Sequence, residues 1–132
     1  LIVPVIDLET ILNIKPDLDE LKDFCVQSGI DIIEVFTPDV FVKEYHYRVR
    51  VFAPTFGYLE DPATGSGNSA FGYYLQKNNL WNDDTLTIEQ NGQRERYNVV
   101  KLQKQVDENN QFKVLFGGGA ITRIEGLYKL SS

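Results

Sequence analysis

The chain has 132 residues, of which 42% are hydrophobic and 24% charged, and this length suits one domain with a single core. The ordinary globular composition argues against a disordered chain, a collagen-like repeat or a disulfide scaffold. Nineteen acidic residues against 13 lysines and arginines give a formal net charge of -6, so we expect no nucleic-acid partner held by bulk electrostatics.

The sequence also argues against a membrane segment and a metal site. No apolar run approaches the roughly 20 residues that a membrane-spanning helix needs, and the start at Leu1 lacks the basic flank of a signal peptide. Cys25 is the one cysteine, no group of residues has zinc-site spacing, and we expect an inert core thiol in a reducing, cytoplasmic setting. Because the chain has no methionine and opens in a strand-like run, we also expect that an upstream portion is missing.

The first part of the chain predicts two strands with a helix between them. The apolar, β-branched run 1–8 is typical of a buried strand, and 30–37 is predicted as the second. Asp17 and Glu20 have the spacing of a capping box, apolar residues follow at helical intervals, and Gly29 ends the run. We therefore expect a surface helix with one apolar stripe.

The middle of the chain changes from an alternating strand to an uncharged helix. Residues 45–52 alternate and place a basic row on one face. His46 is interpreted as a surface or packing residue, and Arg50 can bind a substrate acid or pair with Glu60, so neither is included in the candidate site. Residues 66–76 carry no charged side chain, so we expect this helix to be surrounded by protein.

Strands dominate the rest of the chain and fix the predicted fold class. They are predicted at 85–90, 97–105, 111–116 and 120–130, with turn signals between them. About seven strands, one central helix and one outer helix predict an α+β fold, in which a curved, barrel-like mixed sheet wraps round the central helix. We expect a single domain over residues 1–132. Doubly wound α/β is disfavoured because strands and helices do not alternate.

The candidate site begins where the uncharged helix starts, at Gly65, Ser66 and Gly67. The first turn of a helix has amide groups without intrahelical partners, and the macrodipole adds about half a positive charge there. A glycine-rich helix start can therefore hold a carboxylate or a phosphate. The pattern of a phosphate-binding P-loop does not occur, which favours a carboxylate. Ser66 can alternatively act only as the helix cap.

Asp61 lies at the mouth of the same turn. A carboxylate there repels an anionic ligand unless it is protonated, hydrogen-bonded to a donor of the ligand, or acting as an acid or base. The alternative is an Asx-type turn that only rigidifies Asp61-Pro62. On local grounds both interpretations stay open.

A family resemblance rests on the string Glu60-Asp61-Pro62-Ala63-Thr64-Gly65-Ser66-Gly67, preceded by Arg50-Val51-Phe52-Ala53-Pro54 and followed by Phe116-Gly117-Gly118-Gly119-Ala120. With these segments the chain resembles, over essentially its whole length, the carboxy-terminal half of the PhzF family of phenazine-biosynthesis-like isomerases. The resemblance implies a fold shared with diaminopimelate epimerase, in which two similar halves enclose the ligand. It also implies cofactor-independent proton transfer next to a carboxylate-bearing carbon. The main base would be a glutamate of the amino-terminal half, which this chain lacks.

The resemblance also assigns roles to individual residues. It implies Asp61 and Ser66 as catalytic residues, and Thr64, Gly65, Gly67 and Asn68 as substrate-binding residues. Asn68 stands where the family often has a histidine, so one group that titrates near neutrality is absent. Residues 89–96 do not match the family's pattern, and the substrate identity stays open. A two-thiol mechanism, as in related epimerases, is excluded because Cys25 is far from this loop.

We therefore expect the carboxy-terminal domain of an isomerase that acts on a small carboxylic acid, uses no cofactor or metal, and is inactive without its amino-terminal half. A homodimer is expected from the family. The rival hypothesis is a non-catalytic anion-binding or interaction module of the same fold, which Asn68 favours. The upstream sequence discriminates the two, because only the enzyme needs an ionisable residue in the amino-terminal motif.

Overall fold

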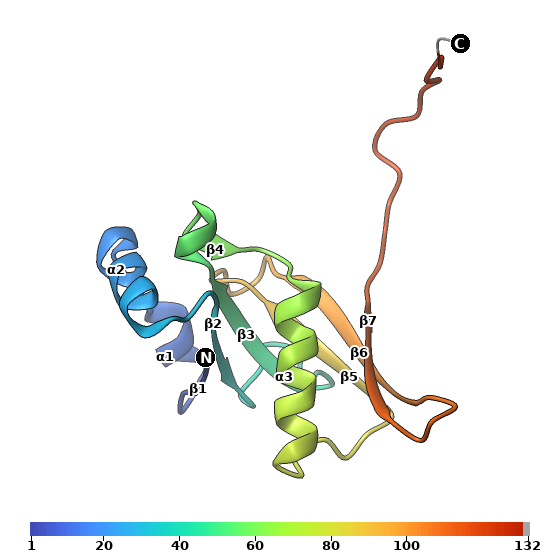
Figure 1. Cartoon of the computed structure of the whole chain (residues 1–132), viewed down its shortest axis with the longest axis horizontal. Coiled ribbons are helices and arrows are strands. Elements are labelled where there is room, and N and C mark those ends of the chain that lie inside the picture. Colours follow the sequence, from blue (N-terminus) through green and yellow to red (C-terminus); the bar gives the residue numbers. More distant parts are fainter. Residues whose placement is uncertain (131–132) are drawn as a thin grey trace.

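The structure is a computed structural model and describes residues 1–130. Within these residues, seven strands form one mixed sheet and three α-helices lie beside it (Figure 1). The strands are β1 (Ile2–Pro4), β2 (Ile33–Thr37), β3 (Tyr47–Phe52), β4 (Glu60–Asp61), β5 (Thr85–Gln90), β6 (Asn98–Val106) and β7 (Phe112–Gly117). The helices are α1 (Leu8–Asn13), α2 (Leu18–Ser28) and α3 (Gly65–Lys77), with a short 3-10 helix, η1, at Pro54–Phe56. None of the helices in the described part of the chain has the length and apolar character of a membrane span.

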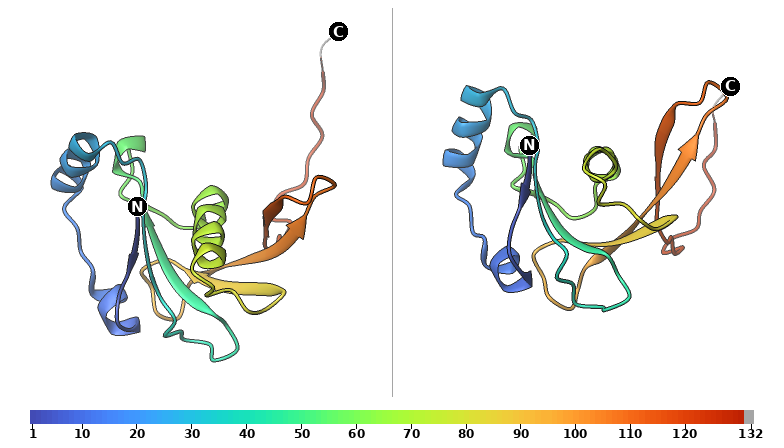
Figure 2. Two further views of the ribbon diagram at one scale, coloured as in Figure 1. Left: turned by 60° about the horizontal axis from the view of Figure 1, so that its bottom comes forward. Right: turned by 90° about the horizontal axis from the view of Figure 1, so that it is seen from below.

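The sheet is mixed and curled. Its order is β1-β2-β3-β5-β6-β7, with β4 paired to the end of β3. The pairs β1–β2 and β3–β5 are parallel, and the other pairs are antiparallel. The view along α3 in Figure 2 shows the sheet curving round this helix. The predicted α+β fold, a curved mixed sheet round a central helix, is therefore confirmed.

The larger core lies between α3 and the concave face of the sheet. Phe71 and Leu75 of α3 are fully buried, and the Phe71 ring centroid lies 4.8 Å from that of Phe36 and 5.3 Å from that of Tyr47. The other buried members of this core are Val49, Trp81, Leu86, Ile88, Val100 and Leu102. Since burying one such side chain contributes about 1.5–3 kcal/mol, this core is what holds α3 on the sheet.

A second core lies under α1 and α2. Its buried members are Leu8, Ile11, Cys25, Ile33, Val35 and Phe52. Asp17 Oδ1 accepts hydrogen bonds from the N–H groups of Asp19 and Glu20 at 2.9 and 3.0 Å, and Gly29 ends α2 with a φ of 64°. The predicted helix is thus confirmed, whereas its apolar stripe is buried only in part, because Leu18 and Phe24 are exposed. Cys25 is buried and unpaired, in agreement with the predicted core thiol.

The predicted strand 1–8 is too long. Only Ile2–Pro4 pairs with β2, and α1 begins at Leu8. Asp7 Oδ1 accepts a hydrogen bond from the Thr10 N–H group at 2.8 Å. This local cap starts a helix where the apolar pattern alone predicted extended chain.

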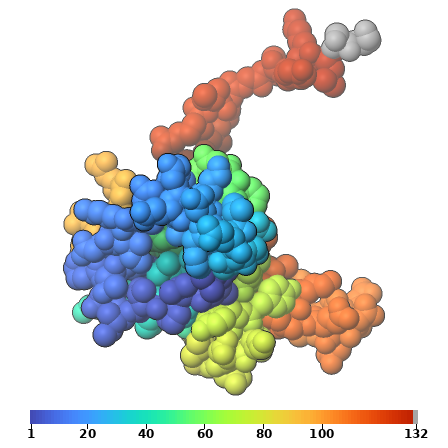
Figure 3. All heavy atoms as spheres, turned by 60° about the vertical axis from the view of Figure 1, so that its left-hand side comes forward, coloured from blue at the N-terminus to red at the C-terminus, as the bar shows by residue number. Residues whose placement is uncertain are grey.

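The predicted strand 120–130 is wrong. No helix or strand is formed from 118 to 130, and this segment projects away from the body of the molecule (Figures 1 and 3). The side chains of Ile124, Leu127 and Tyr128 are 91%, 99% and 89% exposed. A strand needs a hydrogen-bonded neighbour, and residues 1–130 supply none for this segment.

The prediction that protein surrounds the uncharged helix on every side is also wrong. Ser66, Ala70 and Tyr73 follow one another at helical spacing on one face of α3, and all three are exposed. The sheet curls only part of the way round α3 (Figure 2). One uncharged face of the helix therefore stays uncovered.

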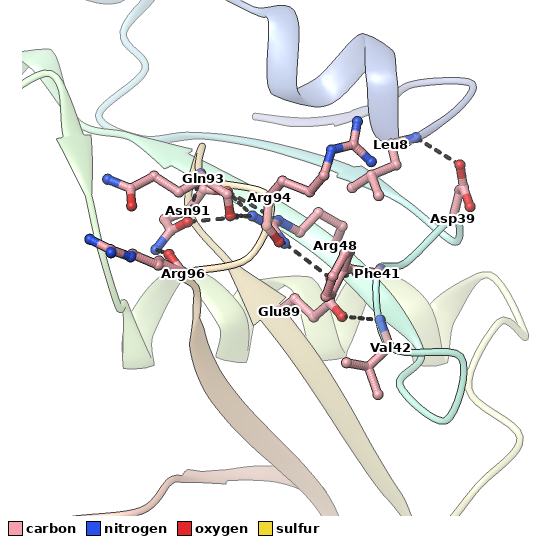
Figure 4. Close-up of polar contacts among 10 residues, drawn as sticks. All are labelled: Leu8, Asp39, Phe41, Val42, Arg48, Glu89, Asn91, Gln93, Arg94 and Arg96. Carbon is pink, nitrogen blue, oxygen red and sulfur yellow. Dashed lines mark hydrogen bonds and ion pairs between the residues drawn. The ribbon is translucent and has the colours of Figure 1, made fainter.

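The basic row predicted on β3 lies in buried positions. Arg48 is fully buried, with Nη1 3.1 Å from Glu89 Oε2 and Nη2 2.8 Å from the Asn91 carbonyl oxygen (Figure 4). Glu89 also accepts hydrogen bonds from the N–H groups of Phe41 and Val42 at 3.0 and 2.7 Å. The ion pair thus connects two loops to the middle of the sheet.

Candidate functional site

The predicted site residues lie in the connection from β4 to α3. Asp61 pairs with Val51 at the end of β3, which fixes where this connection starts. Thr64 is the N-cap, with a φ of -114° and a ψ of 115°, and α3 begins at Gly65. The sheet therefore holds one end of the candidate site, and the helix start forms the other.

Arg50 anchors the beginning of the site loop. Its Nε and Nη2 atoms donate to Oε1 and Oε2 of Glu60 at 3.0 and 2.8 Å, and its Nη1 atom donates to the carbonyls of Ile11 and Ile14 at 3.0 and 2.7 Å. Such a bidentate pair is among the stronger side-chain contacts. Of the two predicted roles for Arg50, pairing with Glu60 is the one observed, and it ties α1 to β4.

Gln90 of β5 holds the turn between Asp61 and Thr64. Its side chain is fully buried, and Oε1 accepts hydrogen bonds from the Thr64 N–H group at 3.1 Å and from Asn68 Nδ2 at 2.7 Å. Gln90 Nε2 donates to the Asp61 carbonyl at 2.8 Å and to Thr64 Oγ1 at 3.2 Å. A single amide thus fixes both ends of the turn. The role of Gln90 was not predicted, since an amide at the end of a predicted strand is no signal by itself.

The start of α3 offers N–H groups to a ligand. Within the helix the first hydrogen bond runs from the Asn68 N–H group to the Thr64 carbonyl at 3.4 Å, so the N–H groups of Gly65, Ser66 and Gly67 precede it. Ser66 lies inside the helix and Thr64 occupies the N-cap, so the alternative that Ser66 caps the helix is wrong. These N–H groups, together with the macrodipole, favour an anion.

A cavity of about 540 Å³ adjoins the helix start. Ala63 and Gly65 line one side of it, and residues 97–100 and 116–119 line the other. A Cβ atom at Gly65 would overlap the ring of Phe116, so the missing side chain at Gly65 leaves room for this ring at the helix start. Ser66 lines a second, smaller cavity of about 130 Å³.

Asp61 is half-buried at the edge of the loop. Its Oδ1 atom accepts a hydrogen bond from the Ala63 N–H group at 3.1 Å, so the predicted Asx-type turn is present. Its Oδ2 atom accepts no hydrogen bond from the residues that the structure describes. The turn therefore leaves one carboxylate oxygen for a ligand, and the acid-base role of Asp61 stays a prediction.

Gly67 and Asn68 face the protein interior. Asn68 is fully buried, and besides its contact with Gln90 its Nδ2 atom donates to the Thr64 carbonyl at 2.7 Å. A Cβ atom at Gly67 would lie 3.2 Å from an oxygen of Glu34. Both residues visibly position the loop, and their direct contact with a substrate stays a prediction.

Glu34 of β2 is a second residue near the helix start that was not predicted from the sequence. Glu34 is only 2% exposed. Burial raises the pKa of its carboxyl group from 4.5 to about 8, although the nearby α-amino group of Leu1 favours the carboxylate. The signal was a single acid inside the apolar run of β2, because unpaired acids are rarely buried.

Comparison with known proteins finds a matching family model and several relatives. A family model described as phenazine biosynthesis-like protein matches residues 1–126. Antisense-enhancing sequence 1 of Schizosaccharomyces pombe is 28% identical over 127 residues, which are 96% of this chain and 42% of the relative. An uncharacterized isomerase of the same organism is 25% identical over 88% of this chain and 64% of its own length. An uncharacterized isomerase of Clostridium acetobutylicum is 26% identical over 86% of this chain and 39% of its own length. The chain thus spans 39% to 64% of the length of these relatives.

Solved structures resemble the same fold. The phenazine biosynthesis protein of Bacillus anthracis, of the PhzF family, superimposes with a TM-score of 0.75 at 22% identity, covering 89% of this chain and 41% of that one. The PhzF-family protein of Enterococcus faecalis superimposes with a TM-score of 0.56 at 22% identity, covering 91% of this chain and 44% of that one. The curled sheet with its central helix is therefore a fold found in these proteins.

Proposed function

This chain belongs to the phenazine biosynthesis-like protein family, and we propose that it is the carboxy-terminal half of an isomerase that moves a proton on a small carboxylic acid. Two of its curated relatives are named isomerases, which supports the reaction class. In this proposal the substrate lies between this chain and an amino-terminal half. The share of the relatives that the chain spans, 39% to 64%, supports such an arrangement.

The observation that carries the proposal is the fixed loop with N–H groups at one end and Asp61 at the other. The N–H groups of Gly65 and Ser66 bind the substrate carboxylate. The free oxygen of Asp61 holds or protonates a polar group beside the reacting carbon. The main base, in the amino-terminal half, removes the proton from the carbon next to the carboxylate, and the proton returns at another position without a cofactor. Thr64, Gly67 and Asn68 keep the pocket in shape.

The test is Asp61→Asn in the complete two-domain protein. A positioned acid or base typically contributes about 10² to 10⁴ in rate, so we expect a loss of that order in turnover. The assay is deuterium exchange from solvent into a panel of small cyclic and amino carboxylic acids, followed by proton NMR. Asp84→Asn, at an exposed position, is the matched control and should keep its turnover. A loss of less than about threefold for Asp61→Asn would remove Asp61 from the mechanism.

The rival function is a non-catalytic module that binds a small anion. Asn68 favours it, because an amide side chain at this position cannot titrate near neutrality. The exchange assay separates the two, since a complete protein that binds these acids without exchanging deuterium is such a module. We also propose that the chain alone is inactive and that the protein works in the cytoplasm. The proposed homodimer is tested by light scattering of the purified protein.

A further inference from the structure

Glu34 is a buried carboxyl group that the proposed function does not use. Glu34 lies on β2 opposite Val51 of β3 and is only 2% exposed. Neither Oε1 nor Oε2 has a hydrogen-bond partner among residues 1–130. Because buried polar groups are normally hydrogen-bonded, a carboxyl group without any contact points to a partner from outside.

The carboxyl group of Glu34 points at the start of α3. Its Oε2 atom lies 3.2 Å from the place that a Cβ atom of Gly67 would occupy, so the missing side chain lets it reach the first helical turn. The cavity of about 130 Å³ is lined by Glu34, by Ser66 and Gly67, and by Leu1, Ile2, Ile32 and Ala70. This cavity has room for one carboxyl group of a ligand. A buried, unpartnered acid and the first turn of a helix therefore line one small cavity.

The groups around Glu34 determine its protonation state. Immediately before β1, the charged α-amino group of Leu1 acts on Glu34 and favours the carboxylate. From α3 the wall consists of Ser66, Gly67 and Ala70, none of which has a titratable side chain. Burial outweighs the amino group and raises the pKa to about 8, so at pH 7 most of the carboxyl group carries its proton. In that form Glu34 is an O–H donor.

We propose that protonated Glu34 donates a hydrogen bond to a ligand carboxylate held in the cavity beside Ser66 and Gly67, and that it is a further substrate-binding residue of this half. A hydrogen bond from an acid to a carboxylate is charge-assisted and stronger than a neutral one. An ammonium group suits the place less, because the start of a helix disfavours a cation. The proposal rests on the proposed function only for the chemical class of the natural ligand.

The test uses sodium acetate as the probe and the 132-residue chain with isotope-labelled alanine methyl groups. The Ala70 methyl group lines the cavity and should shift as acetate is added at pH 6.5, whereas sodium chloride at equal ionic strength should leave it unchanged. Since only protonated Glu34 binds, and its pKa is about 8, the Kd should rise by about 30-fold between pH 6.5 and pH 9.5. A Kd that is equal at both pH values, or an Ala70 signal that acetate does not move, would overturn the proposal.

Two variants identify the group responsible. Glu34→Gln keeps an N–H donor but cannot ionise, so its Kd for acetate should change less than about twofold over the same pH range. Glu108→Gln removes an exposed acid and should behave as the wild type. If Glu34→Gln keeps the full pH dependence, another group is responsible and the proposal fails.

A measurement on the wild type covers the case in which Glu34→Gln does not fold. The carboxyl carbon of Glu34 can be titrated by NMR with and without acetate, and binding to the protonated form should raise its pKa. An unchanged titration curve would contradict the proposal. None of these readouts involves turnover or Asp61, so failure of the proposed isomerase function and failure of this proposal can be told apart.

Discussion

Replacing Gln90 by leucine tests whether the site loop depends on one buried amide. Leucine has a similar size but removes four hydrogen bonds at once. The Thr64 N–H group, which is buried, and the Asp61 carbonyl lose this partner, whereas Asn68 Nδ2 keeps its bond to the Thr64 carbonyl. The turn that carries Asp61 should therefore loosen.

The size of the effect follows from these contacts. A buried donor or acceptor without a partner costs about 1–3 kcal/mol. Thr64 should bear most of that cost, because it is 6% exposed, while the half-buried Asp61 has access to water. The additional apolar surface of leucine offsets part of the loss. We therefore expect the free energy of unfolding to fall by about 1–3 kcal/mol.

Urea unfolding followed by the fluorescence of Trp81, the one tryptophan and a buried residue, measures this change. The matched control is Gln103→Leu on β6, since Gln103 is exposed and has one hydrogen bond, at 3.3 Å, to Thr85. The control should stay within about 0.5 kcal/mol of the wild type. If Gln90→Leu also stays within about 0.5 kcal/mol, the four contacts do not hold the loop and the reasoning is refuted.

Two further predictions concern packing and pH. Gly72→Ala places a Cβ atom 2.9 Å from Val114 and 3.0 Å from Trp81, and the Tm should fall, because overpacking costs about 1–3 kcal/mol and outweighs the better helix propensity of alanine. The control is Gly126→Ala, whose Cβ atom meets nothing within 4 Å. A higher Tm for Gly72→Ala would contradict the packing argument. For Glu34, the folded-state pKa of about 8 lies above its ordinary value of 4.5, so its favourable contribution is complete below pH 4.5 and is lost as the pH rises to about 8. Relative to Glu34→Gln, the free energy of unfolding should decline by about 1.4 kcal/mol per pH unit in that range, and a constant difference in urea unfolding would argue against a protonated, buried acid.

Elements whose limits are set by neighbouring residues could be predicted from the sequence. Asp17 and Gly29 act on the backbone beside them, and α2 lies between them as predicted. The strand predicted at 85–90 has the bounds of β5. The site string of Asp61 to Ser66 could be found because its acid, its glycine and its serine lie within six residues of one another. In each case the physical cause lies within a few residues of its effect.

The features that could not be predicted depend on partners that are distant in the sequence. Residues 120–130 have the apolar content of a strand, but strand formation needs a neighbour that no local pattern supplies. Gln90 acts on Thr64 across 26 residues, and nothing near Gln90 indicates this contact. Glu34 and Gly67 meet only because the sheet curls round α3. The degree of that curl also decides that Ser66 stays exposed.

The parallel pairing of β3 with β5 constrains how this region can change. Two adjacent parallel strands need a crossover connection that runs back along the sheet, and α3 lies in that connection (Figure 1). The turn 61–64 is a link in this connection, clamped by β4 on one side and by the helix on the other. Added or deleted residues there would pull strands out of alignment, so new chemistry has to arise by exchanging side chains on a backbone of constant length. A proteolytic cut at the turn would likewise separate β1, β2 and β3 from the covalent path to β5, β6 and β7.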